Sequence, residues 1–325
     1  MKKIYFLASL LIGSLSFGQA ADGFSYSGSL DSNGWTSHSG VIPAQLATLT
    51  GSLSYAGLTS VGNKTSLVSG NTQDANKASA AALTGTSYFS GVINVVNTTG
   101  LGANTTTGDY FLHSAATAGG TVTAFFARTY VRAGVVLNTF NLGILNASGG
   151  TAAPSFSTTD YPVGTPVFIV VKYDIATNTA SLFVNPVIGG TEGTATVTNV
   201  TGTTGAPTSI ASLCIRQGGT TGNIELDELR IGGAYAYVTA AVLGINQNAI
   251  AGLNIYPNPV SGSILNIETA ANGSKAVAIF DVLGKQVVNV TTANTTINVA
   301  NLNAGIYIVK ITEEGKTATR KLVIK

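Results

Sequence analysis

Charged residues are scarce in this chain of 325 residues, at 9% of the sequence, whereas globular domains average about 25%. Lysine and glutamate, which usually fill the surfaces of helices, are rare in the body of the chain, while glycine, threonine and valine are abundant. Threonine and valine favour strands, and glycine favours turns. The composition therefore predicts an all-β protein. Its 45% of hydrophobic residues is enough to bury a core, which excludes a chain that is disordered throughout.

Cysteine and histidine are almost absent. The single cysteine, Cys214, excludes an internal disulfide framework, and its place in an apolar run predicts a buried packing role. The two histidines, His38 and His113, lie far apart in the sequence and outside any recognisable ligand or triad motif. Calcium would need a dense aspartate cluster, which the sequence lacks. We therefore predict no metal, no cofactor and no catalytic residues.

Strong charge of one sign and long apolar runs are also missing. The net charge is only +2, which does not indicate a nucleic-acid partner, and no segment after the N-terminus has 18 consecutive apolar residues. The start of the chain is different, because Lys2 and Lys3 precede an apolar stretch and then small residues. This pattern predicts a signal peptide over residues 1–20, cleaved after Gly18 or Ala20, and a mature chain without a transmembrane segment.

The last 73 residues, 253–325, read as a separate small domain. Short strands are predicted at 264–268, 276–280, 286–290, 296–299, 306–311 and 319–325, separated by regularly spaced turns. The two prolines near residue 258 predict an extended edge or a turn at the entry. Together these elements predict an immunoglobulin-like β-sandwich. Residues 238–252, which have no charge and no periodicity, are the predicted linker and a site for proteolytic processing.

Four motifs in this block occur in the order of a known family. Tyr-Pro-Asn-Pro at 256–259, Asp-Val-Leu-Gly-Lys at 281–285, Ala-Gly-Ile-Tyr at 304–307 and the lysine-bearing end at 321–325 resemble the type A sorting domain of type IX secretion substrates. The resemblance implies recognition by the outer-membrane export and sortase machinery, and delivery through the periplasm to the surface or the medium. The predicted sorting-signal residues are Tyr256, Pro257, Asn258, Pro259, Asp281, Gly284, Lys285, Gly305, Tyr307, Lys321 and Lys325.

The central residues, 21–237, are predicted to form one large β-sandwich domain. Strands are expected at 88–96 and 121–131, and the apolar run 167–171 is expected to be buried on both faces. A turn at 174–178 leads to a returning strand at 180–184. In the last strand, 224–231, the apolar alternation slips at Asp227-Glu228, which predicts a β-bulge. This strand and the hairpin before it resemble laminin-G-like, concanavalin-type jelly rolls.

The acidic run of this last strand raises the question of catalysis. Jelly-roll glucanases place a nucleophile and an acid/base on one strand, and Glu225, Asp227 and Glu228 resemble half of that pattern. The second catalytic glutamate is missing, because Leu229 and Arg230 occupy its positions. The residues therefore favour a structural role, in which Asp227 and Glu228 hold the bulge and Glu228 pairs with Arg230.

Three functions stay open at this point. The first is a non-catalytic surface or secreted protein for binding or adhesion, with glycans as candidate ligands. The second is a polysaccharide-degrading glycoside hydrolase, and the third is a structural component of an extracellular layer. Aromatic rings stack on sugars, although most aromatic residues of a large sandwich belong to its core. The candidates for such a platform are Trp35, Tyr55, Tyr88, Tyr110, Phe111 and Tyr130.

Overall fold

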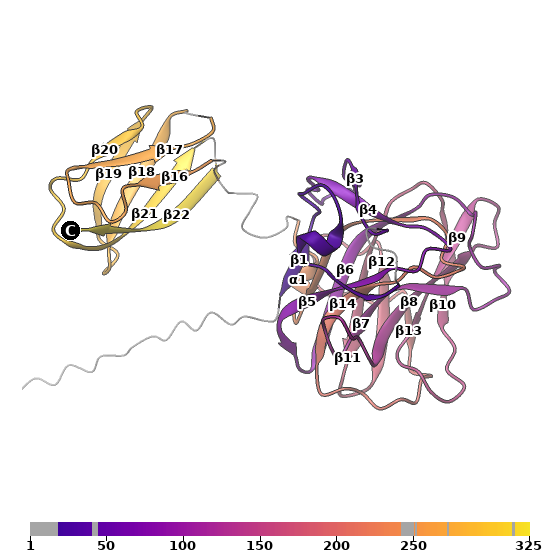
Figure 1. Cartoon of the computed structure of the whole chain (residues 1–325). Helices are drawn as coiled ribbons and strands as arrows, with labels where there is room; N and C mark the ends of the chain where they lie inside the picture. Colours follow the sequence, from indigo (N-terminus) through magenta and orange to yellow (C-terminus); the bar gives the residue numbers. More distant parts are fainter. Residues whose placement is uncertain (1–18, 41–44, 242–249, 251, 272, 314–315) are drawn as a thin grey trace, which may run out of the picture. The chain divides into compact units, whose positions relative to one another are not determined.

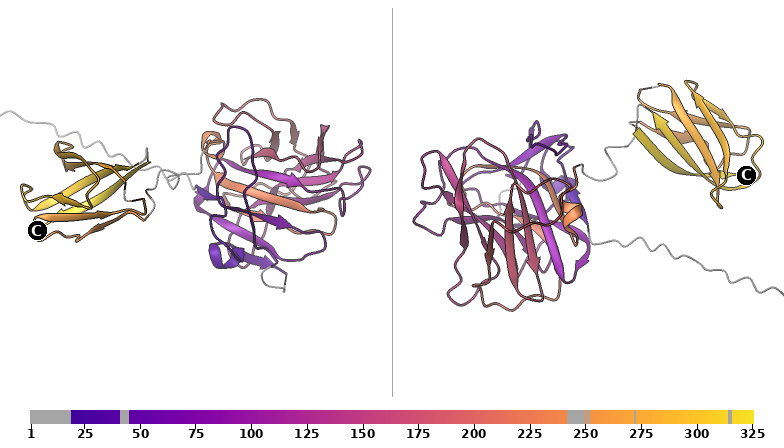
Figure 2. Two further views of the ribbon diagram at one scale, coloured as in Figure 1. Left: turned by 90° about the horizontal axis from the view of Figure 1, so that it is seen from above. Right: turned by 180° about the vertical axis from the view of Figure 1, so that it is seen from behind.

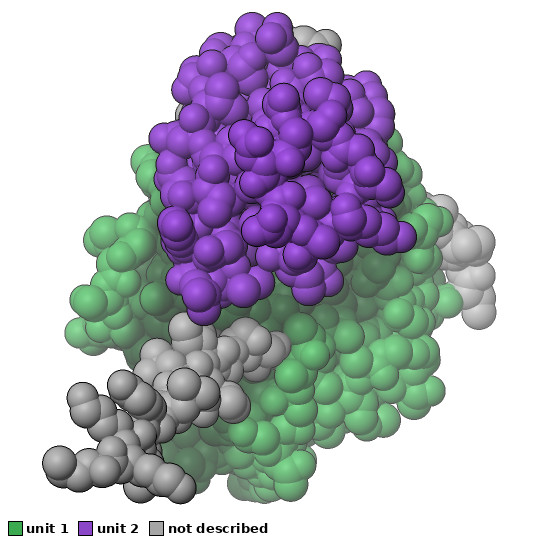
Figure 3. Space-filling view, turned by 90° about the vertical axis from the view of Figure 1, so that its left-hand side faces the viewer, with its two compact units in different colours: residues 1–243 green, residues 244–325 purple. Residues whose placement is uncertain are grey.

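The computed structural model describes residues 19–40, 45–241, 250, 252–271, 273–313 and 316–325. The chain divides into two compact units, residues 1–243 and 244–325 (Figures 1 and 3). Regular structure in the described residues is almost entirely β, apart from the 3-10 helix η1 (Leu30–Asn33) and the four-residue helix α1 (Tyr235–Val238). The all-β prediction is confirmed.

The central unit contains an eight-stranded antiparallel sheet. Its strands follow the order β13-β12-β11-β6-β15-β4-β3, and β1 pairs with β15 beside that path. The strands are β1 (Ala20–Asp22), β3 (Thr48–Thr50), β4 (Asn63–Leu67), β6 (Thr86–Val95), β11 (Val167–Asp174), β12 (Thr179–Val184), β13 (Val197–Asn199) and β15 (Ile224–Gly232).

A seven-stranded antiparallel sheet lies against it, in the order β10-β9-β8-β7-β14-β5-β2 (Figures 1 and 2). Its strands are β2 (Thr36–Ser39), β5 (Asp74–Leu83), β7 (Asp109–Ala115), β8 (Phe125–Ala133), β9 (Thr139–Leu145), β10 (Ser155–Pro162) and β14 (Ile210–Ile215). One hydrophobic core, drawn from both sheets, fills the space between them. This is the predicted large sandwich of jelly-roll type.

Strand β11 confirms the prediction of a strand that is buried on both faces. Ile169 and Val171 point into the core between the sheets, while Phe168 and Val170 belong to a second apolar cluster on the opposite face. Helix α1 contributes Tyr235 to that second cluster. The predicted turn to β12 is also present, with Asp174 Oδ1 accepting hydrogen bonds from two turn amides.

The predicted bulge in β15 is present as well. The pairing of β15 with β6 shifts between Asp227 and Arg230, and Glu228 has a φ of 52°, in the left-handed region. The shift places Leu226 and Leu229 in the same core. A bulge thus restores one buried face after the alternation slips.

One predicted strand begins later than we expected from the sequence. The run 121–131 was expected to be extended throughout, but β8 starts at Phe125, where it pairs with Ala115. The preceding residues form a loop. Thr123 N–H donates to the nearby Thr117 Oγ1, and Gly119 N–H donates to Asn76 Oδ1 on β5, so side chains take bonds that a strand partner would supply.

The C-terminal unit is a small sandwich with its own core. A three-stranded sheet, β16-β17-β20, faces a four-stranded sheet, β19-β18-β21-β22. The predicted strands agree with the structure to within a few residues. The strands are β16 (Asn254–Tyr256), β17 (Ile264–Glu268), β18 (Lys275–Asp281), β19 (Gln286–Thr292), β20 (Thr296–Asn298), β21 (Gly305–Glu313) and β22 (Lys316–Ile324).

The ends of the predicted linker, 238–252, belong to the two units. Val238 and Thr239 are fully buried in the central unit, and Ala241 accepts a hydrogen bond there from Thr59 N–H. Ile250 is buried in the core of the C-terminal unit. The central unit thus extends beyond residue 237, while residues 242–249 and the predicted signal peptide up to residue 18 lie outside the described residues.

Candidate functional site

Three arginines lie on the outward face of the seven-stranded sheet. Arg128 and Arg132 on β8 alternate with residues such as Val131 that enter the core, and Arg216 directly follows the core residue Ile215 at the end of β14. All three are half-buried. Side-chain alternation therefore lines one face of the sheet with guanidinium groups.

Aromatic rings lie directly against these guanidinium groups. The Tyr110 ring on β7 contacts two of them, with its centroid 4.2 Å from Arg216 Cζ and 5.3 Å from Arg128 Cζ. Arg132 Cζ lies 3.6 Å from the centroid of the Phe156 ring on β10. Each contact holds a cation on the negative face of a ring. We call this set, Tyr110, Arg128, Arg132, Phe156 and Arg216, the arginine–aromatic row.

Gly143 on β9 makes room for one end of this row. A Cβ added there would lie 2.8 Å from Phe156 Cδ1, closer than carbon atoms approach without displacement. A side chain at this position would therefore push the ring away from the sheet and disturb its stack with Arg132. Glycine within a strand often marks such a close approach.

The arginines differ in their ionic partners. Arg216 Nη1 lies 2.5 Å from Asp109 Oδ1, which forms a salt bridge. Arg128 instead donates to Ser148 Oγ, and Arg132 donates to the Thr106 carbonyl. Among the described residues, Arg128 and Arg132 thus form hydrogen bonds to neutral acceptors and no salt bridge within 4.0 Å.

A cavity of about 630 Å³ adjoins the row at Arg132. Its other walls include Val135, Val136, Asn141 and Asp160. Asp160 Oδ2 accepts hydrogen bonds from the Val135 and Val136 amides, and Oδ1 accepts one from Asn141. Burial favours the protonated form, but these hydrogen bonds outweigh it and lower the pKa of Asp160. The cavity is therefore bounded by a guanidinium and by a carboxylate that already has its partners.

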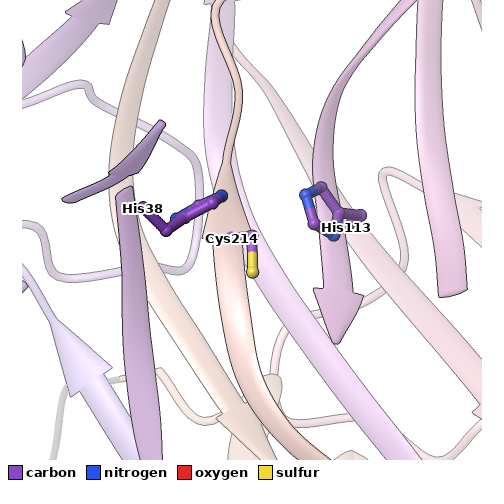
Figure 4. A group of neighbouring side chains, drawn as sticks. All are labelled: His38, His113 and Cys214. Atoms are coloured by element: carbon purple, nitrogen blue, oxygen red, sulfur yellow. The ribbon is translucent and has the colours of Figure 1, made fainter. Parts of the chain in front are cut away.

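His38, His113 and Cys214 meet further along the same face. They come from β2, β7 and β14, and one ligand atom of each lies within 4.8 Å of the other two (Figure 4). Both imidazole rings reach toward the strand that carries Cys214, from opposite sides (Figure 4). The sequence did not predict this cluster, because the pairing of distant strands, and not sequence spacing, brings the three residues together.

The acidic run on β15 lies in the other sheet and has structural partners. Asp227 and Glu228 are fully buried. Asp227 Oδ2 accepts a hydrogen bond from Leu53 N–H at 2.8 Å, and Glu228 lies 3.4 Å from Arg230. Glu225 pairs with Lys64 at 2.8 Å. The expected structural role agrees with these contacts, of which the Asp227 bond holds the loop after β3 against the bulge.

Most of the aromatic candidates are core residues, as predicted. Trp35 and Phe111 belong to the core between the sheets, and Tyr88 and half-buried Tyr55 belong to the apolar cluster around Phe168. Tyr130 is also buried, but it lies on the outward face of β8 beside Tyr110, with 5.6 Å between the ring centroids. Tyr110 is the half-buried candidate that joins the row. Sequence reasoning missed Phe156 and the three arginines. The sequence signal that could have revealed the row is the alternation of arginine with apolar residues on β8.

The motif residues of the C-terminal unit join its first and last segments. Asn258 Nδ2 donates to the Lys321 carbonyl at 2.8 Å, and Val323 N–H donates to Asn258 Oδ1 at 2.9 Å. Val260 exchanges backbone hydrogen bonds with Val323 and Lys325. The Tyr-Pro-Asn-Pro segment thus binds along the edge strand β22.

The other motifs stabilise turns. Asp281 Oδ1 accepts hydrogen bonds from the amides of Leu283 and Lys285, and Gly284 has a φ of 84° that favours glycine. Tyr307 donates its hydroxyl hydrogen to the Asn303 carbonyl, four residues earlier. Each motif therefore has a local structural reason, although none of these contacts by itself identifies a function.

A comparison with protein-family models identifies the family of the C-terminal unit. Residues 254–325 match the family described as secretion system C-terminal sorting domain. The C-terminal unit is such a sorting domain. The sorting domain indicates export by type IX secretion, to the cell surface or the medium, and it implies that the export machinery is a partner. No helix of the described residues is long and apolar enough to span a membrane.

Several solved structures are similar to the chain at low sequence identity. The globular domain of Trypanosoma cruzi calreticulin matches with a TM-score of 0.42 and 10% identity, over 66% of this chain and 90% of that one. The carbohydrate recognition domain of Emp47p matches with a TM-score of 0.35 and 11% identity, over 62% and 88%. A fungal endo-β-1,4-glucuronan lyase from Trichoderma reesei gives 0.37 and 9%, over 68% and 94%. The search of curated proteins finds no match.

Proposed function

We propose that the central unit is a non-catalytic carbohydrate-binding module, delivered outside the cell by its sorting domain. The observation that carries the proposal is the arginine–aromatic row beside the 630 Å³ cavity. Binding sites for sugars combine aromatic surfaces with a few well-placed polar groups in a concave region. The row and the cavity together supply these elements on one face of a rigid sheet.

Acidic sugars are the proposed ligand class. A guanidinium offers five N–H donors, and Arg132 uses one for the Thr106 carbonyl. Its plane is held by the Phe156 ring, so the donors left over are already oriented. Guanidinium groups bind carboxylates and sulfates in bidentate geometry. Within the part of the chain that the structure describes, Arg132 and Arg128 carry no salt bridge that would have to break first. Uronate-containing or sulfated glycans fit this chemistry.

The absence of catalysis is part of the proposal. Retaining glycosidases need two carboxyl groups about 5 Å apart, one of them free to attack or to protonate. The carboxylate beside the cavity, Asp160, is committed to backbone amides and Asn141. The acidic run of β15 is buried in the other sheet. These placements favour binding without bond cleavage.

A glycan array and titration calorimetry test the proposal. We expect the purified chain to bind uronate-containing or sulfated glycans, and Arg132→Gln to weaken binding by about tenfold or more, because charge-assisted hydrogen bonds contribute about 1.5–3 kcal/mol. Lys172→Gln is the matched control, since Lys172 also lies over an aromatic ring, Tyr88, but on the other sheet. It should leave binding unchanged.

Two results would overturn the proposal. One is the absence of binding to every acidic glycan on the array. The other is the release of reducing or unsaturated ends when the chain is incubated with those glycans, which would show that the unit is an enzyme. Equal losses in the Arg132 and Lys172 variants would move the binding site away from the row.

A further inference from the structure

The two histidines and the cysteine of the central unit occupy one row across the seven-stranded sheet. Cys214 on β14 lies opposite His113 on one side and opposite Asn76 on the other. Asn76 in turn lies opposite Thr36 on β2, two residues before His38. Directly paired residues point to the same face of a sheet. The strand register therefore places His113, Asn76 and Cys214 side by side, with His38 at the edge.

Both histidines are held as neutral imidazoles, the form that binds metals. Burial lowers the pKa of His113 to about 3, and burial also lowers the pKa of His38. His113 Nδ1 lies 3.2 Å from the Ser114 carbonyl, so the proton of the ring belongs on Nδ1 and the Nε2 lone pair is left for another partner. A backbone carbonyl commonly orients metal-bound histidines in this way.

Asn76 is a weak donor to His38, whose ring also has a hydrogen bond with the Thr36 backbone. The Asn76 Nδ2 group lies 2.9 Å from the Thr36 carbonyl, 2.9 Å from the Gly119 carbonyl and 3.2 Å from His38 Nδ1. An amide nitrogen has two hydrogens and cannot donate to three acceptors. The two carbonyls are the nearer acceptors, so the hydrogen bond from Asn76 to His38 Nδ1 is the weakest of the three.

The Cys214 thiol is buried beside a hydrogen-bonding neighbour, Ser212. It is fully buried, its sulfur lies 3.5 Å from Ser212 Oγ, and burial raises its pKa to about 12. Ser212 donates its own hydrogen to the Thr117 carbonyl at 2.7 Å, so the thiol hydrogen points to Ser212 Oγ. The thiol is therefore not a nucleophile in its resting state, whereas a metal ion would displace its proton to solvent.

We infer that His38, His113 and Cys214 form a binding site for a thiophilic metal ion, zinc or monovalent copper. Their ligand atoms all lie within 4.8 Å of one another, so an ion at the centre of such a triangle is at most about 2.8 Å from each atom. Bonds from zinc to nitrogen and sulfur are about 2.1 and 2.3 Å long. Small side-chain rotations about χ1 and χ2 are enough to close the difference.

The ligand set selects the ion. Two imidazoles and a thiolate suit zinc and copper, whereas calcium and magnesium require oxygen ligands. The rings of Phe125 and Tyr110 lie 4.6 and 5.6 Å from the His113 ring and line one side of the site. Arg128 and Arg216 disfavour positive charge at His113, whereas the Asp74 carboxylate acts on Cys214. Asp109 pairs with Arg216, and a thiolate at Cys214 would supply the negative charge that a bound cation needs.

Metal counting on the whole chain tests the inference. The chain, purified without a histidine tag and treated with a chelator, is equilibrated with Zn²⁺ or, under anaerobic reducing conditions, with Cu⁺, and the bound ions are counted by native mass spectrometry. We expect one ion per chain. His38→Ala, on the edge strand, and Cys214→Ser should each lower the affinity about 100-fold or more, because each removes a ligand. Thr36→Ala on the same edge strand is the matched control and should bind normally.

Substitution with Co²⁺ supplies a second readout that does not depend on affinity. Thiolate coordination should give a charge-transfer band in the near ultraviolet that is missing from Cys214→Ser. Circular dichroism verifies that each variant is folded. The inference is overturned if the folded wild type binds neither Zn²⁺ nor Cu⁺, if the His38 and Cys214 variants bind as tightly as Thr36→Ala, or if bound Co²⁺ shows no thiolate band. Glycan binding by the arginine–aromatic row is measured separately, so the two proposals can fail independently.

Discussion

Asp22 accepts a hydrogen bond from the indole of Trp35, with 2.7 Å between Oδ2 and Nε1. The same carboxylate oxygen lies 3.0 Å from the Tyr26 hydroxyl and 3.0 Å from Lys77 Nζ, and Oδ1 accepts the Phe24 amide. Trp35 is the only tryptophan of the chain. One nearly buried carboxylate thus connects strand β1, the segment after it and strand β5.

Replacing this carboxylate should destabilise the central unit. In Asp22→Asn an NH₂ group replaces one carboxylate oxygen, so it faces hydrogen-bond donors that previously bonded to that oxygen. The ion pair with Lys77 is also lost. We expect the free energy of unfolding to fall by about 3 kcal/mol, because hydrogen bonds to a charged group contribute about 1.5–3 kcal/mol each and are not additive. Denaturant unfolding followed by Trp35 fluorescence measures this. Asp31→Asn, at an exposed aspartate whose partners are the neutral donors Ser37 and Gln73, is the control and should lose less stability. An equal loss there would contradict the prediction.

Asp227 gives the central unit a second testable property, which depends on pH. Burial raises the pKa of Asp227 to about 7 in the folded chain, whereas an unfolded aspartate titrates near 3.8. Between these values the folded state binds more protons than the unfolded state. The contribution of Asp227 to stability is therefore present at low pH and is lost as the pH rises toward 7.

Asp227→Asn removes this titration. The stability of the variant relative to wild type should rise between about pH 4 and pH 7, by up to about 4 kcal/mol, since one pKa unit corresponds to 1.36 kcal/mol. Urea unfolding of both proteins across this range gives the difference directly, so other titrating groups cancel. A difference that stays constant with pH would show that Asp227 is already ionised below pH 4 in the folded chain.

The positions of most strands in both units could be predicted from the local pattern of apolar and polar residues. The run 167–171 was apolar at every position, and the structure buries both of its faces. The slip in alternation at Asp227 required a bulge for the same reason, because a strand with one buried face cannot change phase without an extra residue. The loop before Phe125 was missed because Thr117 and Asn76 supply hydrogen bonds that the residue pattern does not reveal.

The candidate sites could be predicted much less well. His38, His113 and Cys214 are separated by 75 and 101 positions in the sequence, and three pairings between non-consecutive strands bring them together. The stack of Arg132 on Phe156 likewise depends on the order of β8, β9 and β10 and on Gly143 between them. The sorting motif was found because it is local in sequence, so its residues can be read without the fold.

The pairing of strand β1 gives a prediction for where the proposed signal peptide is cleaved. Strand β1 begins at Ala20, which pairs with Ile231. Cleavage after Gly18 leaves the strand whole, whereas cleavage after Ala20 removes its first residue. We therefore expect the exported chain to begin at Gln19, and intact-mass analysis of the secreted protein measures this. A mass that corresponds to a start at Ala21 would contradict the expectation and show that two residues of β1 are enough to hold it.

Asn258 is expected to support both the stability and the export function of the sorting domain. Its amide acts as a strand partner for β22, accepting from Val323 N–H and donating to the Lys321 carbonyl. β22 is the edge strand of its sheet, and an edge without a partner leaves backbone groups open. Asn258→Ala removes both bonds, so we expect a loss of about 1–3 kcal/mol in the stability of this unit.

Hydrogen exchange across residues 254–325 in the whole chain, together with the distribution of the protein between periplasm and medium, separates the two effects. We expect Asn258→Ala to speed exchange in β22 and to leave more protein in the periplasm. Asn254→Ala, at an exposed asparagine of the same segment, should change neither. Retention in the periplasm with unchanged exchange would mean that the export machinery contacts Asn258 directly. Normal export with faster exchange would mean that the motif serves folding alone, and would remove Asn258 from the sorting signal.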